Sequence, residues 1–252
     1  MLRRRSEHAS EALAHGDSRA ETALGLGAAM VALVVAGAAV GTLAYLVRGK
    51  TALVQLDESV AEWGHTHASA FSTDLLEAIT ELGEPTSVVV MAVVLAVIET
   101  VRTRNRWVAP FLLVVVAGNG IVTTTIKNLA DRVRPELNPI AETLGPSFPS
   151  GHSSWSAAFF AAAALLLGRG RSPRTRAALA GVAAALIVVM AGTRVLLGVH
   201  WLSDVIAGVA IGLAWLCVCA VAFGGRLLRF GAGVDEAGVA DRALDRRRVG
   251  TP

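Results

Sequence analysis

Residues 193–204 read Thr-Arg-Val-Leu-Leu-Gly-Val-His-Trp-Leu-Ser-Asp and place three ionisable side chains at the edge of very apolar sequence. His200 and Asp204 are four residues apart, so on a helix they share a face and the carboxylate can hold one imidazole nitrogen. Arg194 precedes them across a glycine-containing bend and offers a planar guanidinium suited to phosphate oxygens. Taken alone, the stretch fits interfacial residues at a helix end as well as it fits a binding site.

The composition is that of an integral membrane protein. Hydrophobic residues make up 54% of the 252-residue chain, and its mean hydropathy is +0.56. Apolar runs of about 20 residues, the length that crosses a bilayer, recur along it. The sequence pI of about 9.4 comes from arginines in short turns between these runs, which is an orientation signal rather than a nucleic-acid-binding stripe. We therefore expect membrane lipids, and no nucleic acid, as partners.

Six apolar segments predict an all-α, polytopic membrane protein. They lie at about residues 23–47, 86–101, 107–126, 153–168, 177–194 and 201–224. A cleavable signal peptide is an alternative for the first, because Ala36-Gly37-Ala38 resembles a cleavage site, but the full length of the run favours a retained span. The expected organisation is a six-helix domain at 23–224 between cytoplasmic segments 1–22 and 225–252.

The segment 48–82, between the first two spans, mixes acidic and apolar residues. Its apolar side chains recur at intervals of three and four, as at Val60 and Trp63. This period predicts one or two amphipathic helices lying on the outer membrane surface. His65 and His67 belong to this segment and are expected to be surface residues.

The basic residues indicate the orientation. With six spans both termini lie on one side, and 17 of the 23 lysines and arginines fall on that side, many of them in the turns 102–106 and 169–176. The positive-inside rule then places both termini in the cytoplasm. Six basic residues remain on the outer side, and at least three of them are expected to have another role. They are Arg48, Lys50, Lys127, Arg132, Arg134 and Arg194.

A second polar cluster follows the third span. Lys127 and Arg134 are seven residues apart, so they face the same way if the third helix continues two turns past the bilayer and Pro135 ends it. Asp131 would then pair with either cation and keep the two tolerable side by side. The alternative is a helix end whose long side chains reach for water.

A third cluster, Pro149-Ser150-Gly151-His152-Ser153, opens the fourth span. Gly151 lets the backbone approach a ligand, Ser153 or Ser154 can cap the helix, and the free N–H groups of its first turn make an anion site. His152 lies where it could touch that anion, although a capping turn with an incidental histidine is the alternative. The three clusters together supply cations, two imidazoles and a carboxylate on one membrane face, a set that would bind a phosphate and act on it.

The residues of these clusters resemble the signature of the type 2 phosphatidic acid phosphatase superfamily. The three blocks, Lys127-x6-Arg134-Pro135, Pro149-Ser150-Gly151-His152 and Arg194-x5-His200-x3-Asp204, match it in order and in spacing at ten positions. Thr193 stands where the family more often has serine or glycine. The spans throughout the chain fit the integral membrane branch of the family, whereas the signature does not cover the tails or the segment 48–82.

The resemblance implies a metal-independent phosphatase that needs no cofactor and acts on a lipid phosphate or pyrophosphate at the outer membrane face. The residues implied to bind the substrate phosphate are Lys127, Arg134, Ser150, Gly151 and Arg194. His200 would form a phosphohistidine with Asp204 fixing its tautomer, and His152 would protonate the leaving group. A metal is not expected, because the His/Asp pair lies among cations and lacks further ligands.

The substrate is expected to be an amphiphile that enters sideways from the bilayer. Polyprenyl pyrophosphate of the undecaprenyl type, phosphatidylglycerol phosphate, phosphatidic acid and a phosphorylated glycolipid are candidates. A phosphotransferase that passes the phosphoryl group to another lipid or sugar is one alternative function, and a lipid transporter is another from a different class. The spans lack the paired, broken segments of a transporter. The oligomeric state stays open, because Gly208-x-x-x-Gly212 could pack within the bundle or between subunits.

Overall fold

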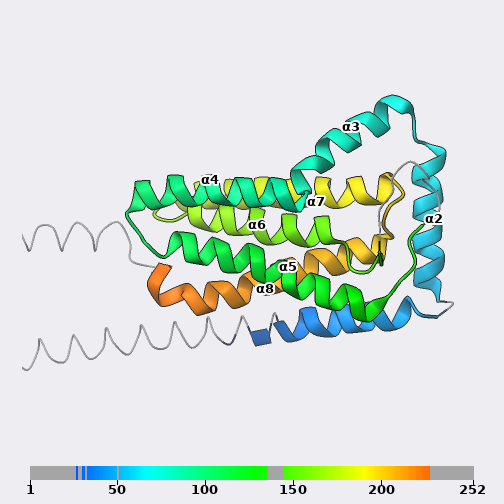
Figure 1. The fold of residues 1–252 in the computed structure, drawn as a ribbon, viewed down its shortest axis with the longest axis horizontal. Helices are drawn as coiled ribbons and strands as arrows, with labels where there is room; N and C mark the ends of the chain where they lie inside the picture. The colour runs from blue at the N-terminus through cyan, green and yellow to red at the C-terminus, as the bar shows by residue number, and fades with distance from the viewer. Residues whose placement is uncertain (1–26, 28–29, 32, 50, 136–144, 228–252) are drawn as a thin grey trace, which may run out of the picture.

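The computed structural model describes residues 27, 30, 31, 33–49, 51–135 and 145–227, with side chains to residue 224, and it is α-helical without strands over these ranges (Figure 1). After an N-terminal helix, Leu33–Leu46, the order is α2 (Ala52–Thr66), α3 (Ala70–Thr80), a 3₁₀ turn (Glu81–Gly83), α4 (Pro85–Thr103), α5 (Val108–Ala130), α6 (Gly151–Leu167), α7 (Pro173–Leu196) and α8 (Leu202–Leu227). The predicted all-α class is confirmed. The predicted terminal segments 1–22 and 225–252 lie outside the described side chains.

Among the described residues, four helices are long and apolar enough to cross a bilayer, which makes the chain a multi-pass membrane protein. They are Pro85–Thr103, Val108–Ala130, Pro173–Leu196 and Leu202–Gly224. Two further apolar helices, Leu33–Leu46 and Gly151–Leu167, are shorter than a usual span within the described residues. The predicted first span, 23–47, lies partly outside those residues, and the count of six spans stays a prediction.

Helix α6 lies at the centre of the bundle and packs against α4, α5, α7 and α8. On its boundary with α8, a Cβ atom at Gly208 would clash with the carbonyl oxygen of Ser150, and one at Gly212 with that of Ser154. The two glycines therefore let the backbones of α6 and α8 touch, as small residues do between membrane helices. The Gly208-x-x-x-Gly212 motif packs within the bundle.

Gly212→Ala is expected to lower the free energy of unfolding by about 1–3 kcal/mol, the usual cost of overpacking a tight contact. The added methyl group would meet the carbonyl oxygen of Ser154, which belongs to a rigid helix and cannot give way. Gly192→Ala in α7 is the matched control, because a Cβ there meets nothing within 4 Å and alanine is the better helix former. Thermal unfolding in mild detergent measures both, and equal melting temperatures would contradict the close packing.

Helix α2 runs across one end of the bundle, and α3 leads from it to the start of α4 (Figure 1). The buried face of α2 carries Asp57, Ala61 and Gly64, whereas Trp63 is 57% exposed. Asp57 thus lies on the face of α2 that packs against the protein, where it finds charged and polar partners. The predicted position of these helices on the outer membrane surface stays a prediction. His65 and His67 are exposed, as predicted.

The predicted continuation of the third helix as far as Arg134 is wrong. Helix α5 ends at Ala130, and Asp131 caps it in the left-handed conformation (φ 46°) while its N–H donates to the Lys127 carbonyl. A left-handed residue turns the chain off the helix axis, so Arg134 lies in a loop. The predicted pairing of Asp131 is also wrong, since no ion pair within residues 51–135 and 145–224 joins it to either cation.

Candidate active site

The three predicted clusters surround a single hollow of about 330 Å³ at the end of the bundle that α2 crosses. The lining residues are Pro85, Thr123, Thr124, Lys127, Arg134, Gly151, His152, Trp155, Arg194 and His200. They come from the last turns of α5 and α7, the first turns of α4 and α6, and the loops that follow α5 and α7. Segments far apart in the sequence thus bring all three cations and both histidines predicted for the site to one place.

A tight bend carries the chain from Arg194 to His200. The N–H groups of Val199 and His200 both donate to the Arg194 carbonyl oxygen, each at 3.2 Å, and Gly198 adopts φ 68°. This left-handed conformation favours glycine, which explains the residue type at this position. The bend places the guanidinium and the imidazole on the wall of the same hollow, as the sequence predicts.

His200 and Asp204 form the predicted pair, although His200 lies in the loop before α8 and not on the helix. Its Nδ1 is 3.4 Å from Asp204 Oδ2, which also accepts the Trp201 N–H at 3.0 Å and so caps the start of α8. On the other side of the ring, Arg134 Nη1 lies 3.3 Å from Nε2. A guanidinium can only donate, so Nε2 is the acceptor and the proton of the neutral ring resides on Nδ1.

The charge state of His200 follows from its surroundings. Only 2% of the residue is exposed, and this burial lowers the pKa of His200 to about 4, against the opposing effect of its hydrogen bond to Asp204. At neutral pH the imidazole is therefore uncharged, with the lone pair of Nε2 available. This is the state required of a histidine nucleophile.

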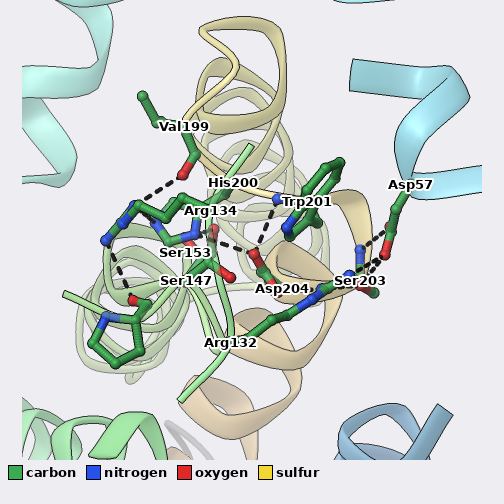
Figure 2. A network of polar contacts seen from close by, with 12 residues as sticks. Asp57, Arg132, Arg134, Ser147, Ser153, Val199, His200, Trp201, Ser203 and Asp204 are labelled. Carbon is green, nitrogen blue, oxygen red and sulfur yellow. Dashed lines mark hydrogen bonds and ion pairs between the residues drawn. The ribbon is translucent and has the colours of Figure 1, made fainter. Parts of the chain in front are cut away.

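Arg134 is fixed by the loop carbonyl groups around it. Its Nη1 donates to Val199 O at 2.8 Å and its Nε to Gly145 O at 2.9 Å (Figure 2). Burial lowers the pKa of Arg134, yet guanidinium groups stay protonated in proteins. The residue thus holds a positive charge beside His200 Nε2, and no carboxylate among the described residues forms an ion pair with it.

Arg194 is the most buried of the three cations, at 6% exposed. Its Nη1 donates to Thr80 Oγ1 at 3.1 Å, and its Nε is a buried donor without a hydrogen-bond partner among the described residues. A buried donor of this kind is costly unless something binds it.

Two further groups line the same hollow. Lys127 is half-buried there. A Cβ atom at Gly151 would meet nothing within 4 Å, so the first turn of α6 faces open space. The arrangement fits an anion of phosphate type.

His152 occupies the first turn of α6, and its Nε2 is 3.3 Å from Oε1 of the half-exposed Glu84 at the start of α4. Ser150 is the N-cap residue of this helix, so the predicted capping by Ser153 or Ser154 is wrong. Ser153 donates instead to the hydroxyl of Ser150 at 3.0 Å, and Ser154 donates to a side chain of α5. The Ser150 hydroxyl is fully buried and is not among the groups that line the hollow.

Three polar residues at the site were not identified from the sequence as functional candidates, and a fourth, Arg132, was named only as one of six basic residues on the outer side. The three are Asp57, Thr80 and Ser203. Arg132 donates from Nη1 to Asp204 Oδ1 at 2.6 Å and from Nη2 to Asp57 Oδ2 at 2.8 Å (Figure 2). The excess of basic residues on the outer side already pointed to Arg132, but no local pattern links it to a carboxylate 75 residues away.

Among the described residues, no group of three or more histidine, cysteine, aspartate or glutamate side chains is arranged to hold a metal ion.

Comparisons with known proteins agree with the geometry. Residues 107–227 match the family model of the PAP2 superfamily. A lipid A 1-phosphatase of Rhizobium etli is 31% identical over 172 residues, which are 59% of this chain and 70% of that protein. A lipid A 1-phosphatase of Rhizobium johnstonii is 35% identical over 141 residues, or 50% of this chain, and the match spans only about half of that relative, 54%.

A solved structure shares the fold. The transmembrane PAP2-type phosphatidylglycerolphosphate phosphatase from Bacillus subtilis superposes with a TM-score of 0.71 at 24% identity, over 79% of this chain and 98% of that one. The family model, the extent of the Rhizobium etli match and the signature blocks seen in the sequence lead to one assignment. The chain belongs to the PAP2 superfamily.

Proposed function

We propose that this protein is a metal-independent phosphatase that removes a phosphoryl group from a membrane lipid through a phosphohistidine at His200. The observation that carries the proposal is the hollow itself. Three cations line it, the buried Nε of Arg194 lacks a partner among the described residues, and the lone pair of His200 Nε2 lies beside Arg134. Phosphoryl transfer needs the phosphate charge neutralised and a nucleophile placed in line, and this set of groups provides both.

In the first step, the non-bridging oxygens of the phosphate take the hydrogen bonds of Arg134, Arg194 and Lys127. Arg134 lies 3.3 Å from Nε2 of His200 in the free protein, so moving its N–H to a phosphate oxygen frees the lone pair. Nε2 then forms a bond to phosphorus while the bond from phosphorus to the lipid oxygen breaks. Asp204, bonded to Nδ1–H, stabilises the positive charge that develops on the ring.

As that bond to the lipid oxygen breaks, in the same first step, the leaving oxygen needs a proton, because a lipid alkoxide departs poorly. Burial and the neighbouring cations lower the pKa of His152 to about 3 in the free protein, so its protonated form would arise only when the negatively charged phosphate binds beside it. His152, which lines the hollow from α6, would then give this proton to the leaving oxygen. In the second step the same imidazole would take a proton from water as that water attacks the phosphohistidine. Glu84 Oε1 lies 3.3 Å from His152 Nε2 and would form an ion pair with the ring once His152 is protonated. General acid–base work of this kind contributes about 10²–10⁴ in rate.

The substrate we propose is a lipid phosphate or pyrophosphate, with phosphatidylglycerol phosphate and polyprenyl pyrophosphate first. Both relatives named as lipid A 1-phosphatases, and the phosphatidylglycerolphosphate phosphatase of known structure, are named for phosphorylated lipids. The basic turns 102–106 and 169–176 lie at the end of the bundle opposite α2 (Figure 1), whereas the helix ends that line the hollow lie at the other end. By the positive-inside rule this supports a site on the outer face and both termini in the cytoplasm.

Phosphate release from a panel of lipid phosphates and pyrophosphates, with EDTA present throughout, tests this proposal. We expect the purified protein to release phosphate from at least one of these lipids at a rate that EDTA does not change. Loss of activity in EDTA with recovery on adding Mg²⁺ would contradict the metal-independent mechanism. With a ³²P-labelled substrate, transfer of the labelled phosphoryl group to an added acceptor lipid or sugar, without label in free phosphate, would indicate a phosphotransferase instead.

A further inference from the structure

Asp57 is an acidic residue of α2 that lies fully buried against the site. Its Oδ1 accepts the N–H of Ser203 at 2.9 Å, and its Oδ2 accepts the Ser203 hydroxyl at 2.5 Å and Arg132 Nη2 at 2.8 Å (Figure 2). Burying a carboxylate is costly unless several donors satisfy it, and here three do. A helix that only rests on the membrane surface has no need of such a residue.

Arg132 connects this carboxylate to the proposed catalytic pair. Its Nη1 donates to Asp204 Oδ1 at 2.6 Å and to the Ser203 hydroxyl at 2.8 Å, while its guanidinium carbon lies 5.4 Å from the centre of the Trp201 ring. The planar fork therefore spans two carboxylates, which a flexible lysine could not do with the same geometry. The contacts form a continuous path from α2 to Asp204.

The arrangement fixes how Asp204 meets His200. Arg132 holds Oδ1, so Oδ2 stays directed at His200 Nδ1 and the Trp201 N–H. A carboxylate bound at both oxygens cannot rotate away from the imidazole. The tautomer with the proton on Nδ1 and an unprotonated Nε2 is therefore maintained.

The net charge of Asp57, Arg132 and Asp204 has a second effect on His200, besides fixing its orientation. One guanidinium is shared by two carboxylates, so the group Asp57–Arg132–Asp204 carries a net negative charge beside His200. That charge favours the positively charged imidazole that forms when Nε2 bonds to phosphorus. Without the carboxylate of Asp57, Arg132 would be balanced by Asp204 alone and the net charge would be zero.

We propose that Asp57 and Arg132 are positioning residues for the transfer step, acting on His200 through Asp204, and that α2 is thereby part of the catalytic apparatus. The inference rests on the proposed function, because it assigns a role within that same site. It also gives the segment 48–82 a task beyond contact with the membrane surface.

Asp57→Asn tests the proposal. The amide keeps the shape of the side chain but removes its charge, so kcat is expected to fall up to about 100-fold, the scale of a small misplacement at a reacting centre. KM should change little, because the phosphate-binding cations are untouched. The matched control is Glu58→Gln, which removes one negative charge from an exposed neighbour on the same helix and should leave kcat unchanged.

A double-mutant cycle separates positioning from simple loss of structure. If Asp57 acts through Arg132, then Asp57→Asn should not lower kcat any further when Arg132 is already replaced by glutamine. Multiplicative losses of kcat, or losses that fall on KM instead, would overturn the proposal. Arg132→Lys keeps the positive charge but not the planar, two-pronged guanidinium. Its kcat should therefore lie between that of the parent and that of Arg132→Gln.

Melting temperatures in detergent show whether each variant is folded at the assay temperature. If Asp57→Asn does not remain folded, Arg132→Lys decides the matter, and an unchanged kcat there would overturn the inference. The activity of the parent protein distinguishes a failure of the proposed function from a failure of the role proposed for α2. Absence of phosphate release from the parent would refute the proposed function, whereas an active parent with an equally active Asp57→Asn variant refutes only the role of α2.

Discussion

Purified His200→Ala protein is expected to release phosphate at least about 10⁴-fold more slowly than the parent, because removing a nucleophile leaves only the binding contribution of the site. The imidazole is nearly fully buried and its Nδ1 is tied to Asp204, so no other described side chain of the hollow offers a lone pair in this position. The measurement is the initial rate of phosphate release in detergent on the best substrate of the panel. The melting temperature verifies that the variant is folded.

A chemical signature makes this result specific. A phosphohistidine survives alkali and decays in acid, so alkaline quenching of the parent with ³²P-labelled substrate should leave label on the protein. The His200→Ala variant should carry none, whereas His65→Ala, which removes an exposed histidine of α2, should label as the parent does. Label on His200→Ala protein would mean that another residue attacks phosphorus.

His152→Ala is the second change with a large expected effect, and the size of that effect should depend on the leaving group. On an alkyl lipid phosphate we expect a loss of about 10²–10⁴ in kcat, the value of a general acid. An aryl phosphate with an acidic phenol as leaving group needs no proton to depart, so the rate of its first step should fall much less. That rate is read from the burst of phenol released before the phosphohistidine is hydrolysed, and the first step of the alkyl substrate is followed in a single turnover with the same purified variant.

Lys127→Ala is the control for this comparison. Its ammonium lines the hollow as a proposed phosphate ligand, so both substrates should slow by similar factors. Equal losses on the two substrates in His152→Ala would remove the assignment of His152 as the general acid and leave it as a binding residue.

The sequence was sufficient wherever the decisive residues are neighbours or lie in long apolar runs. Arg194, His200 and Asp204 fall within one short stretch, and a single glycine bend at Gly198 brings them together as their spacing predicts. Helices α4, α5, α7 and α8 follow from hydropathy alone. In each case one local rule decides the outcome.

It was insufficient where the backbone leaves a regular path or where partners are remote. The left-handed residue at Asp131 ends α5 early, and no periodicity shows that in advance. Thr80 holds Arg194 across 114 residues, and Asp57 meets Arg132 across 75. A residue pattern treats an acid on a surface helix as solvated, whereas here the partly buried Arg132 makes the inward position of Asp57 favourable.

The contact between α6 and α8 has a consequence for how this pocket can diversify. Gly208 and Gly212 leave no side chain between the two backbones, and the Ser150 N–H donates directly to the Asp204 carbonyl at 2.9 Å. Main-chain atoms alone therefore set the distance between α6, which carries the proposed proton donor His152, and α8, whose Asp204 holds the proposed nucleophile His200. A bulkier headgroup must then be accommodated by residues that line the hollow from other helices, such as Pro85 of α4 and Thr124 of α5.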